Sequence, residues 1–196
     1  MVAIVKYNAG NIQSVKYALE RLNADFVVSD DPKVLRKADK IIFPGVGEAS
    51  SAMNYLRKTK LDQVLKSLDQ PFLGICLGLQ LMCNSSFENN TDCLGLFDYQ
   101  VTKFDDTKGY KIPHMGWNQI SFDDKNPLFK NIEQNSYFYF VHSYYVPKGD
   151  DTLAFCDYND IKFSAALHKD NYYGVQFHPE KSGEIGAKIL KNFLEL

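Results

Sequence analysis

The sequence has little of what marks a membrane, secreted or nucleic-acid-binding protein. Its longest apolar stretch, residues 71–83, contains Gln80 and falls well short of the ~20 residues that a membrane-spanning helix needs. The first residues lack the pattern of a signal peptide. Lysine and arginine are scattered rather than clustered, and the formal net charge is only -2, which argues against nucleic acid or an anionic membrane as the partner. We therefore expect a cytoplasmic protein that binds a small molecule or another protein.

Cysteine is also scarce, and its spacing excludes two common uses. The cysteines form no CxxC pair and no metal-ligand pattern with histidine, and a chain of this size does not depend on disulfides for its stability. We expect no metal site and free thiols in a reducing compartment. The cysteines are Cys76, Cys83, Cys93 and Cys156.

Internal repeats, low-complexity tracts and linkers are absent as well. The chain has 196 residues, of which 45% are hydrophobic, so it has enough apolar material for a core and the length of one ordinary domain. We therefore expect a single domain over residues 1–196.

The first half of the sequence alternates strand-like and helix-like segments. Short apolar runs are ended by turn residues, after which apolar residues recur at helical spacing. The strand-like runs are residues 1–7, 26–28, 41–43 and 72–75, and helical patterns occupy residues 12–22 and Leu77 to about Phe87. Repeated units of this kind favour an α/β fold with a buried, mostly parallel central sheet flanked by helices.

The second half is richer in strand-like runs, which we interpret as antiparallel strands added to the parallel core. A last helix is predicted after Ser182, a candidate N-cap, because Ile185, Ile189 and Phe193 fall on one helical face. The strand-like runs are residues 97–104, 119–122, 137–146, 153–158, 163–168 and 173–177.

Residues 74–78 (Gly-Ile-Cys-Leu-Gly) form the most informative motif. Glycines lie two positions on either side of Cys76 where a buried strand meets a helix, as in a nucleophile elbow, whose sharp turn exposes the central side chain. The helix N-terminus would favour a thiolate, and the Leu77 N–H would be available to an oxyanion. The alternative is a buried structural cysteine, which is the commoner fate of an arbitrary cysteine and the one we expect for the other three.

His178-Pro179-Glu180 is the second motif. If the chain stays extended through Pro179, the side chains of His178 and Glu180 point to the same side and pair as base and orienting carboxylate. On its own this tripeptide would more often be a surface loop. Its occurrence together with the cysteine elbow favours a Cys76, His178, Glu180 catalytic triad.

A GxCxG elbow followed by HPE near the C-terminus resembles the class I glutamine amidotransferases, and the match runs nearly end to end. The resemblance implies a flavodoxin-like fold and hydrolysis of L-glutamine to glutamate and ammonia through a glutamyl thioester, with no metal and no organic cofactor. It also implies that Gln80 and Glu88 bind the amino-acid end of glutamine and that His142, Ser143 and Tyr144 hold its carboxylate end.

The glycine-rich residues 44–47 (Pro-Gly-Val-Gly) lack the lysine and the spacing of a phosphate-binding loop. By resemblance, Gly47 borders the substrate and Val46 carries a mobile backbone donor to the oxyanion. The alternative is a tight turn after a strand.

Four motifs resemble the branch of the family that serves imidazole glycerol phosphate synthase in histidine biosynthesis: residues 7–12, 44–47, 112–118 and 178–182. The resemblance implies a heterodimer with a (β/α)8-barrel cyclase, which uses the ammonia to make imidazole glycerol phosphate and aminoimidazole carboxamide ribotide. It places Asn11, Trp117, Tyr139 and Lys181 on the side facing that partner, although core packing is an equally good prediction for Trp117. Lys6 stands where this branch commonly has an acidic residue.

Three other functions remain open from the sequence. The chain could be the glutaminase of another synthase, such as one that makes pyridoxal phosphate or anthranilate, although residues 113–118 and 178–182 weigh against this. It could be a catalytically silent docking subunit, which an intact triad disfavours. A cysteine peptidase on a related α/β fold is disfavoured by the side chains that match a free amino-acid site.

Overall fold

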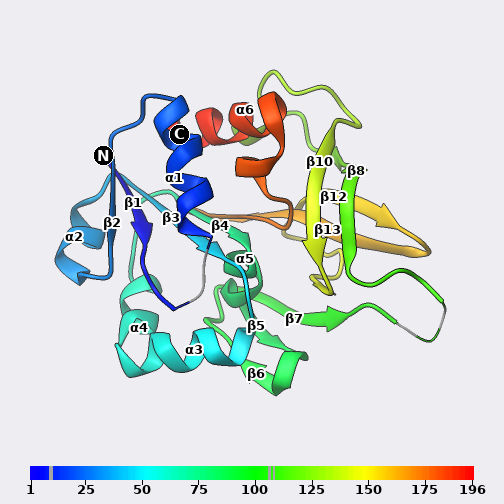
Figure 1. The fold of residues 1–196 in the computed structure, drawn as a ribbon, viewed down its shortest axis with the longest axis horizontal. Helices are drawn as coiled ribbons and strands as arrows, with labels where there is room; N and C mark the ends of the chain where they lie inside the picture. The colour runs from blue at the N-terminus through cyan, green and yellow to red at the C-terminus, as the bar shows by residue number, and fades with distance from the viewer. Residues whose placement is uncertain (9–10, 106, 108) are drawn as a thin grey trace.

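The computed structural model describes residues 1–8, 11–105, 107 and 109–196 of the protein. Among these residues, an eight-stranded sheet forms the centre of the fold, in the order β2-β1-β3-β4-β14-β13-β12-β9 (Figure 1). Two smaller sheets, β10-β8 and β11-β7-β5-β6, lie beside it. Ala9 and Gly10, which belong to the motif at residues 7–12, lie outside the described residues.

The first five strands of the central sheet are parallel, as the alternation of strands and helices predicts. They are β1 (Val2–Val5), β2 (Phe26–Ser29), β3 (Lys40–Gly45), β4 (Phe72–Cys76) and β14 (Tyr172–Val175). The helices that accompany them are α1 (Ile12–Arg21), α2 (Pro32–Lys37), α3 (Ala49–Lys58), α4 (Leu61–Leu65), α5 (Leu77–Met82) and α6 (Gly183–Leu194).

The remaining strands of the central sheet are antiparallel, as expected for the second half of the chain. They are β13 (Ile161–Lys169), β12 (Thr152–Tyr158) and β9 (Ser121–Phe122). The smaller sheets contain β5 (Cys83–Ser86), β6 (Thr91–Asp92), β7 (Phe97–Lys103), β8 (His114–Gln119), β10 (Tyr137–His142) and β11 (Tyr144–Tyr145). Short 3-10 turns are η1 (Glu88–Asn90), η3 (Pro127–Phe129) and η4 (Pro179–Lys181).

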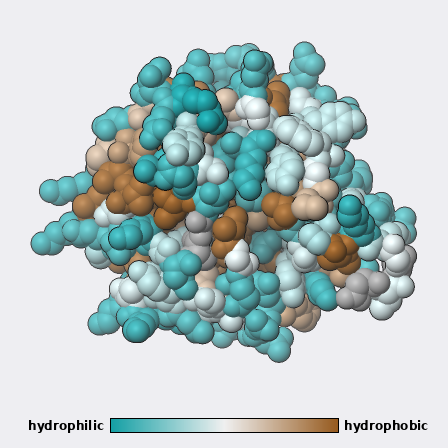
Figure 2. Space-filling view, in the orientation of Figure 1, coloured by the Kyte–Doolittle hydropathy of each residue, from teal (hydrophilic) through white to brown (hydrophobic). Residues whose placement is uncertain are grey.

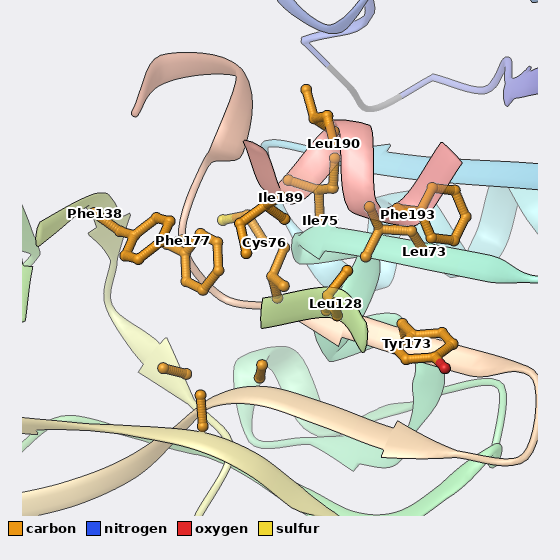
Figure 3. Close-up of a cluster of buried hydrophobic side chains, with 14 of the residues drawn as sticks. Leu73, Ile75, Cys76, Leu128, Phe138, Tyr173, Phe177, Ile189, Leu190 and Phe193 are labelled. Carbon is orange, nitrogen blue, oxygen red and sulfur yellow. The ribbon is translucent and has the colours of Figure 1, made fainter. Parts of the chain in front are cut away.

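Two apolar clusters cover the two faces of the parallel strands. Val2 and Ile4 of β1 belong to one cluster, and Ala3 and Val5 to the other, as the alternation of side chains along a strand requires. Figure 3 shows β4 residues of the first cluster lying against α6, which contributes Ile189, Leu190 and Phe193. Burial on both faces explains why these strands are continuously apolar in sequence.

The surface in Figure 2 is mainly hydrophilic, with apolar residues gathered in separate patches. No helix among the described residues is long and apolar enough to span a membrane.

The helix that follows Cys76 is shorter than predicted. It ends at Met82 rather than near Phe87, and residues 83–86 form strand β5. The carbonyls of Leu81, Met82 and Cys83 accept hydrogen bonds from the backbone N–H groups of residues 94, 96 and 95. A neighbouring segment therefore satisfies the last carbonyls of the helix, and tertiary contacts override the local helical pattern.

Two further expectations need correction. Ser182 precedes α6 as predicted, but its side chain makes no capping hydrogen bond to the helix and instead donates to the carbonyl of His178 at 2.7 Å. The run at residues 173–177, which we expected among the antiparallel additions, begins as β14, whose pairing with β4 is parallel. Strand β8, which we predicted only as part of a motif, pairs with β10 along its whole length.

Candidate active site

Cys76 occupies a strained turn between β4 and α5. Its backbone has φ 54° and ψ -109°, a conformation that costs a residue with a side chain about 1–3 kcal/mol. The flanking glycines allow close packing around this turn: a Cβ at Gly78 would lie 1.9 Å from the Phe43 carbonyl oxygen, and one at Gly74 would lie 2.4 Å from Met82 Sδ. The elbow thus needs both glycines for space.

A cavity of about 330 Å³ opens in front of this cysteine. All six residues that the sequence predicts to bind glutamine line it, and so do the two predicted oxyanion residues. The lining residues are Val46, Gly47, Cys76, Leu77, Gln80, Glu88, Pro113, Val141, His142, Ser143 and Tyr144. The volume suits a small molecule of the size of an amino acid.

His178 and Glu180 lie behind the cysteine, away from solvent. His178 Nδ1 is 2.8 Å from Glu180 Oε1, and both side chains are almost fully buried. The pairing predicted from the sequence assumes that the chain is extended through Pro179. This assumption is wrong, because Pro179–Lys181 form the turn η4. The turn is attached to β10: the His178 N–H donates to the Tyr139 carbonyl at 2.9 Å, and the Tyr139 N–H donates to Ser182 Oγ at 3.0 Å.

The electrostatics of this pair favour a charged imidazole. Burial lowers the pKa of His178, but a Cys76 thiolate and the Glu180 carboxylate together outweigh burial and raise that pKa to about 10. The second ring nitrogen, Nε2, is buried and has no hydrogen-bond partner in the described part of the chain. His178 is therefore suited to take the proton of the Cys76 thiol and to hold it as an imidazolium.

Gln176 contacts the cysteine as well, and it is not among the site residues predicted from the sequence. Its Nε2 donates to Cys76 Sγ at 3.6 Å, and its Oε1 accepts from Gln80 Nε2 at 2.9 Å. Gln80 Nε2 also donates to the Tyr144 carbonyl at 2.9 Å. The one available signal was a polar residue inside the apolar run at residues 173–177.

The loop that carries Val46 is held at its two ends. At the first end, the buried Tyr7 hydroxyl donates to the Pro44 carbonyl at 2.8 Å. At the second end, the Glu48 carboxylate caps α3 by accepting from the N–H groups of Ser50 and Ser51, both at 2.7 Å. Burial raises the pKa of Glu48, but these donors outweigh it and lower the pKa to about 2.

Between these two anchors the loop is exposed. Val46 has 37% of its surface exposed, and Gly47 has a φ of 117°, which a residue with a side chain rarely adopts. Solvent rather than packed side chains therefore surrounds this part of the cavity wall, and glycine permits its backbone conformation.

Glu88 lies opposite this loop, on η1 rather than on the elbow helix. Its Oε2 accepts from the Ala49 N–H at 2.8 Å. A second hydrogen bond joins the same two segments, with the donor on η1: Asn89 Nδ2 donates to Glu48 Oε1 at 2.8 Å. Burial and the nearby Glu48 raise the pKa of Glu88, against the effect of the Ala49 N–H. A partly buried carboxylate of this kind favours a cationic ligand group.

His142 faces the cavity but uses both ring nitrogens within the protein. Its Nδ1 lies 2.7 Å from the Tyr144 carbonyl and its Nε2 lies 3.0 Å from His114 Nδ1. Since a carbonyl only accepts, His142 Nδ1 carries the proton and His114 Nδ1 donates to His142. Burial lowers the pKa of His142 to about 3 and that of His114 to about 4, so both rings are neutral.

Three of the four predicted partner-facing residues lie together on the β8–β10 ribbon and η4. Trp117 is 55% exposed, so core packing, the alternative prediction for it, is wrong. Its ring centroid is 6.1 Å from that of Tyr139, and Lys181 Nζ is 5.9 Å from the centre of the Tyr139 ring. Asn11 is the N-cap of α1, where its side chain accepts from the Ser14 N–H at 3.4 Å.

Among the residues that the structure describes, no group of three or more histidine, cysteine or acidic side chains is placed to hold a metal ion. The four cysteines are all buried and free.

Comparison with known families agrees with this geometry. Residues 4–196 match the model of the glutamine amidotransferase class-I family. The chain therefore belongs to the class I glutamine amidotransferases.

The curated relatives that we compared share one name within this family. The chain is 58% identical to the imidazole glycerol phosphate synthase subunit HisH of Bacteroides fragilis, over 100% of this chain and 99% of that protein. It is 55% identical to the subunit of the same name in Bacteroides thetaiotaomicron, over 100% and 99%. For the subunit of that name in Vibrio parahaemolyticus the identity is 49%, over 100% and 98%.

Solved structures support the fold. One titled a glutamine amidotransferase matches with a TM-score of 0.75 at 16% identity, covering 99% of this chain and 97% of that one. The PurLQS structure from Thermotoga maritima matches with a TM-score of 0.72 at 20% identity, covering 99% and 97%. At these identities the likeness concerns the fold alone, and it confirms the predicted flavodoxin-like α/β architecture.

Proposed function

We propose that this chain is the glutaminase subunit of an imidazole glycerol phosphate synthase and that it hydrolyses L-glutamine with Cys76, His178 and Glu180. The observation that carries the proposal is the strained position of Cys76, which places its side chain at a cavity of amino-acid size in front of a buried His178–Glu180 pair. The high identity to HisH subunits supports the choice of synthase.

The cavity wall offers complementary groups to each end of glutamine. Glu88 is a partly buried carboxylate that suits the α-ammonium group. Gln80 uses both Nε2 hydrogens within the protein, so its Oε1 remains as a second acceptor for that ammonium. The segment 142–144 also lines the cavity and would hold the carboxylate of the substrate.

The reaction follows from this placement. His178 takes the thiol proton, and Cys76 Sγ adds to the carboxamide carbon of glutamine. The imidazolium returns the proton to the leaving nitrogen, so that ammonia departs and a glutamyl thioester remains. Water then attacks the thioester with His178 as base, releasing glutamate and the thiol. The N–H of Leu77 and a backbone N–H beside Val46 would stabilise the oxyanion in both halves of the reaction.

The ammonia is used best if it never enters solvent, where it would be protonated and diluted. We propose that the chain forms a heterodimer with a (β/α)8-barrel cyclase and passes ammonia directly to it. The exposed Trp117 and the half-buried Tyr139 beside it support a docking role for the β8–β10 ribbon, because aromatic side chains are enriched at the centres of interfaces.

A co-purification experiment with candidate barrel cyclases tests the proposal. The complex should make imidazole glycerol phosphate from glutamine, and an electrophilic glutamine analogue should modify Cys76 and stop this synthesis. Complex formation without modification of Cys76 and without glutamate release would instead indicate a silent docking subunit. Glutamate release together with synthesis of a different product would assign the chain to another synthase.

A further inference from the structure

Gln176 is a buried polar residue whose position needs an explanation. It follows β14, between Val175 and Phe177, and its exposed fraction is 0%. A primary amide in such a place is costly unless its hydrogen bonds are made. Its two bonds within the described structure go to Gln80 and to the sulfur of Cys76, so one of its partners is the nucleophile itself.

The direction of these hydrogen bonds is fixed by the chemistry of the partners. The Tyr144 carbonyl can only accept, so the Gln80 atom 2.9 Å from it is the amide nitrogen. The same nitrogen lies 2.9 Å from Gln176, which must therefore present its oxygen to Gln80. The nitrogen of Gln176 is thus left to point at Cys76 Sγ, 3.6 Å away, as a donor.

A donor aimed at this sulfur matters most when the sulfur is charged. Hydrogen bonds to an ionised acceptor are roughly twice as strong as those between neutral groups. When the thiol proton moves to His178 Nε2, the negative charge remains on Sγ, next to the Gln176 N–H. Both side chains are already in place and the site is closed to water on this side, so this stabilisation requires no rearrangement.

We propose that Gln176 is a further catalytic residue, whose side-chain amide, oriented by Gln80, stabilises the Cys76 thiolate. The proposal rests on the glutaminase function proposed above, in which Cys76 is the nucleophile. It assigns Gln80 a second task, which is to position the Gln176 amide from the side of the substrate cavity.

The pH dependence of thiol alkylation tests this assignment without using glutamine. The full chain is treated with iodoacetamide from roughly pH 3.5 to pH 9, a range that covers both a thiol beside an imidazolium and an ordinary thiol with a pKa of about 8.5. Modification of Cys76 is followed by mass spectrometry. Gln176→Met removes the donor but keeps a side chain of similar length. We expect the apparent pKa of the Cys76–His178 pair to rise by about one unit, which is a tenfold loss of thiolate below that pKa.

Two variants control for indirect effects. Cys76→Ala gives the background from the other three cysteines, which are buried. Asn192→Leu removes another buried amide, whose Nδ2 donates to the carbonyls of Leu128 and Lys130 and touches neither the sulfur nor its partners. It should lower the melting temperature without changing the alkylation pKa.

The result that would overturn the proposal is a folded Gln176→Met variant whose alkylation pKa equals that of the wild type. Should that variant fail to fold, Gln80→Met decides the question, because it releases the Gln176 amide without contacting Sγ. A raised pKa in Gln80→Met supports the proposal, and an unchanged one refutes it. Failure of the proposed function is a separate outcome: the wild-type chain would then release no glutamate even with a cyclase, whatever its alkylation profile.

Discussion

The two walls of the cavity differ in how firmly they are held. What we call the inner wall is Cys76, which lines the cavity, together with Gln176 and His178, which are packed against it from the core. These side chains are at most 6% exposed and are joined to neighbouring elements by hydrogen bonds. The outer wall consists of the loop at Val46 and Gly47 with Glu88 opposite, and Val46 is 37% exposed. The groups that break and form bonds are thus packed in the core, whereas the loop next to the proposed oxyanion is exposed to solvent.

This difference indicates where a conformational change that controls the reaction would cost the least free energy. A change of the inner wall would have to disturb a packed core, whereas a turn of the peptide near Gly47 alters the oxyanion site at little cost. We expect inner-wall substitutions to abolish chemistry and outer-wall substitutions to tune it.

The largest effect is expected at the nucleophile. Cys76→Ala in the synthase complex should lower glutamine-dependent synthesis on the order of 10⁶-fold, as removal of a triad nucleophile does. Synthesis from added ammonium salt should persist, because the cysteine serves only the release of ammonia. Parallel assays with the two nitrogen sources measure this, and an equal loss of both activities in an assembled complex would contradict it.

Glu180→Gln tests the carboxylate that pairs with His178 of the inner wall. The amide preserves size but no longer favours the imidazolium form of His178, so turnover should fall by roughly 10²- to 10⁴-fold. Labelling of Cys76 by a reactive glutamine analogue should still occur. Steady-state kinetics with glutamine give the measurement, and unchanged turnover would remove Glu180 from the triad.

The adjustable loop should show its effect through the partner. In the free chain, the backbone donor beside Val46 need not point at the oxyanion, so we expect poor glutaminase activity. Docking of a cyclase that carries its own ligand should raise kcat by roughly 10²- to 10³-fold, the usual value of one oxyanion donor, with little change in KM. Full activity of the free chain, or activation through KM alone, would show that the outer wall is as preformed as the inner one.

The neutral pair of His142 and His114 predicts how the stability of the protein changes in acid. The folded pKa values of about 3 for His142 and about 4 for His114 lie below the ordinary value of 6.5. Because these folded values are depressed, the unfolded chain binds more protons below pH 6.5, and stability falls as the pH drops from 6.5 toward 4. Each histidine should cost about 2 kcal/mol at pH 5.

Replacement of His114 by phenylalanine provides the comparison. Urea denaturation at pH 7 and pH 5 should show a smaller loss of stability in His114→Phe than in the wild type, even though the variant is less stable at pH 7. Equal losses in the two proteins would show that the pair does not titrate in this range.

The smallest effect on activity is expected at the contact between η1 and the loop, which together form the outer wall. Asn89→Gly removes the hydrogen bond to Glu48, which ties η1 to the loop. We expect glutamine to bind about 3- to 10-fold more weakly, as the loss of one hydrogen bond of about 1 kcal/mol implies. The KM for glutamine measures it.

Asn90→Gly is the matched control for this substitution. Asn89 and Asn90 both have left-handed backbones, with φ of 53° and 47°, so glycine relieves the same strain at either position. No hydrogen bond of the Asn90 side chain is found in the described structure, and its replacement should leave KM unchanged. A similar KM in the two variants would show that the contact with Glu48 does not position Glu88.

The sequence predicted the local motifs of the site better than its contacts between distant segments. The elbow at Cys76 and the His178–Glu180 pair are local motifs, and the residues that give them their geometry are near neighbours in sequence. The roles of Gln176 and His114 depend on partners 100 and 28 residues away, and one sequence offers no information about such pairs. The early end of α5 escaped prediction for the same reason, since its last carbonyls are satisfied by residues 94–96.

The glycine at position 78 is one of the places where the two walls meet. There the elbow helix touches the Phe43 carbonyl with no side chain between them, and β3 continues from Phe43 directly into the loop at Val46. The separation of nucleophile and oxyanion loop is therefore set by main chain against main chain. Evolution cannot adjust such a spacing by exchanging one side chain for another, so inherited variation in rate among related chains should accumulate in the loop and on the docking ribbon, while the elbow stays the same.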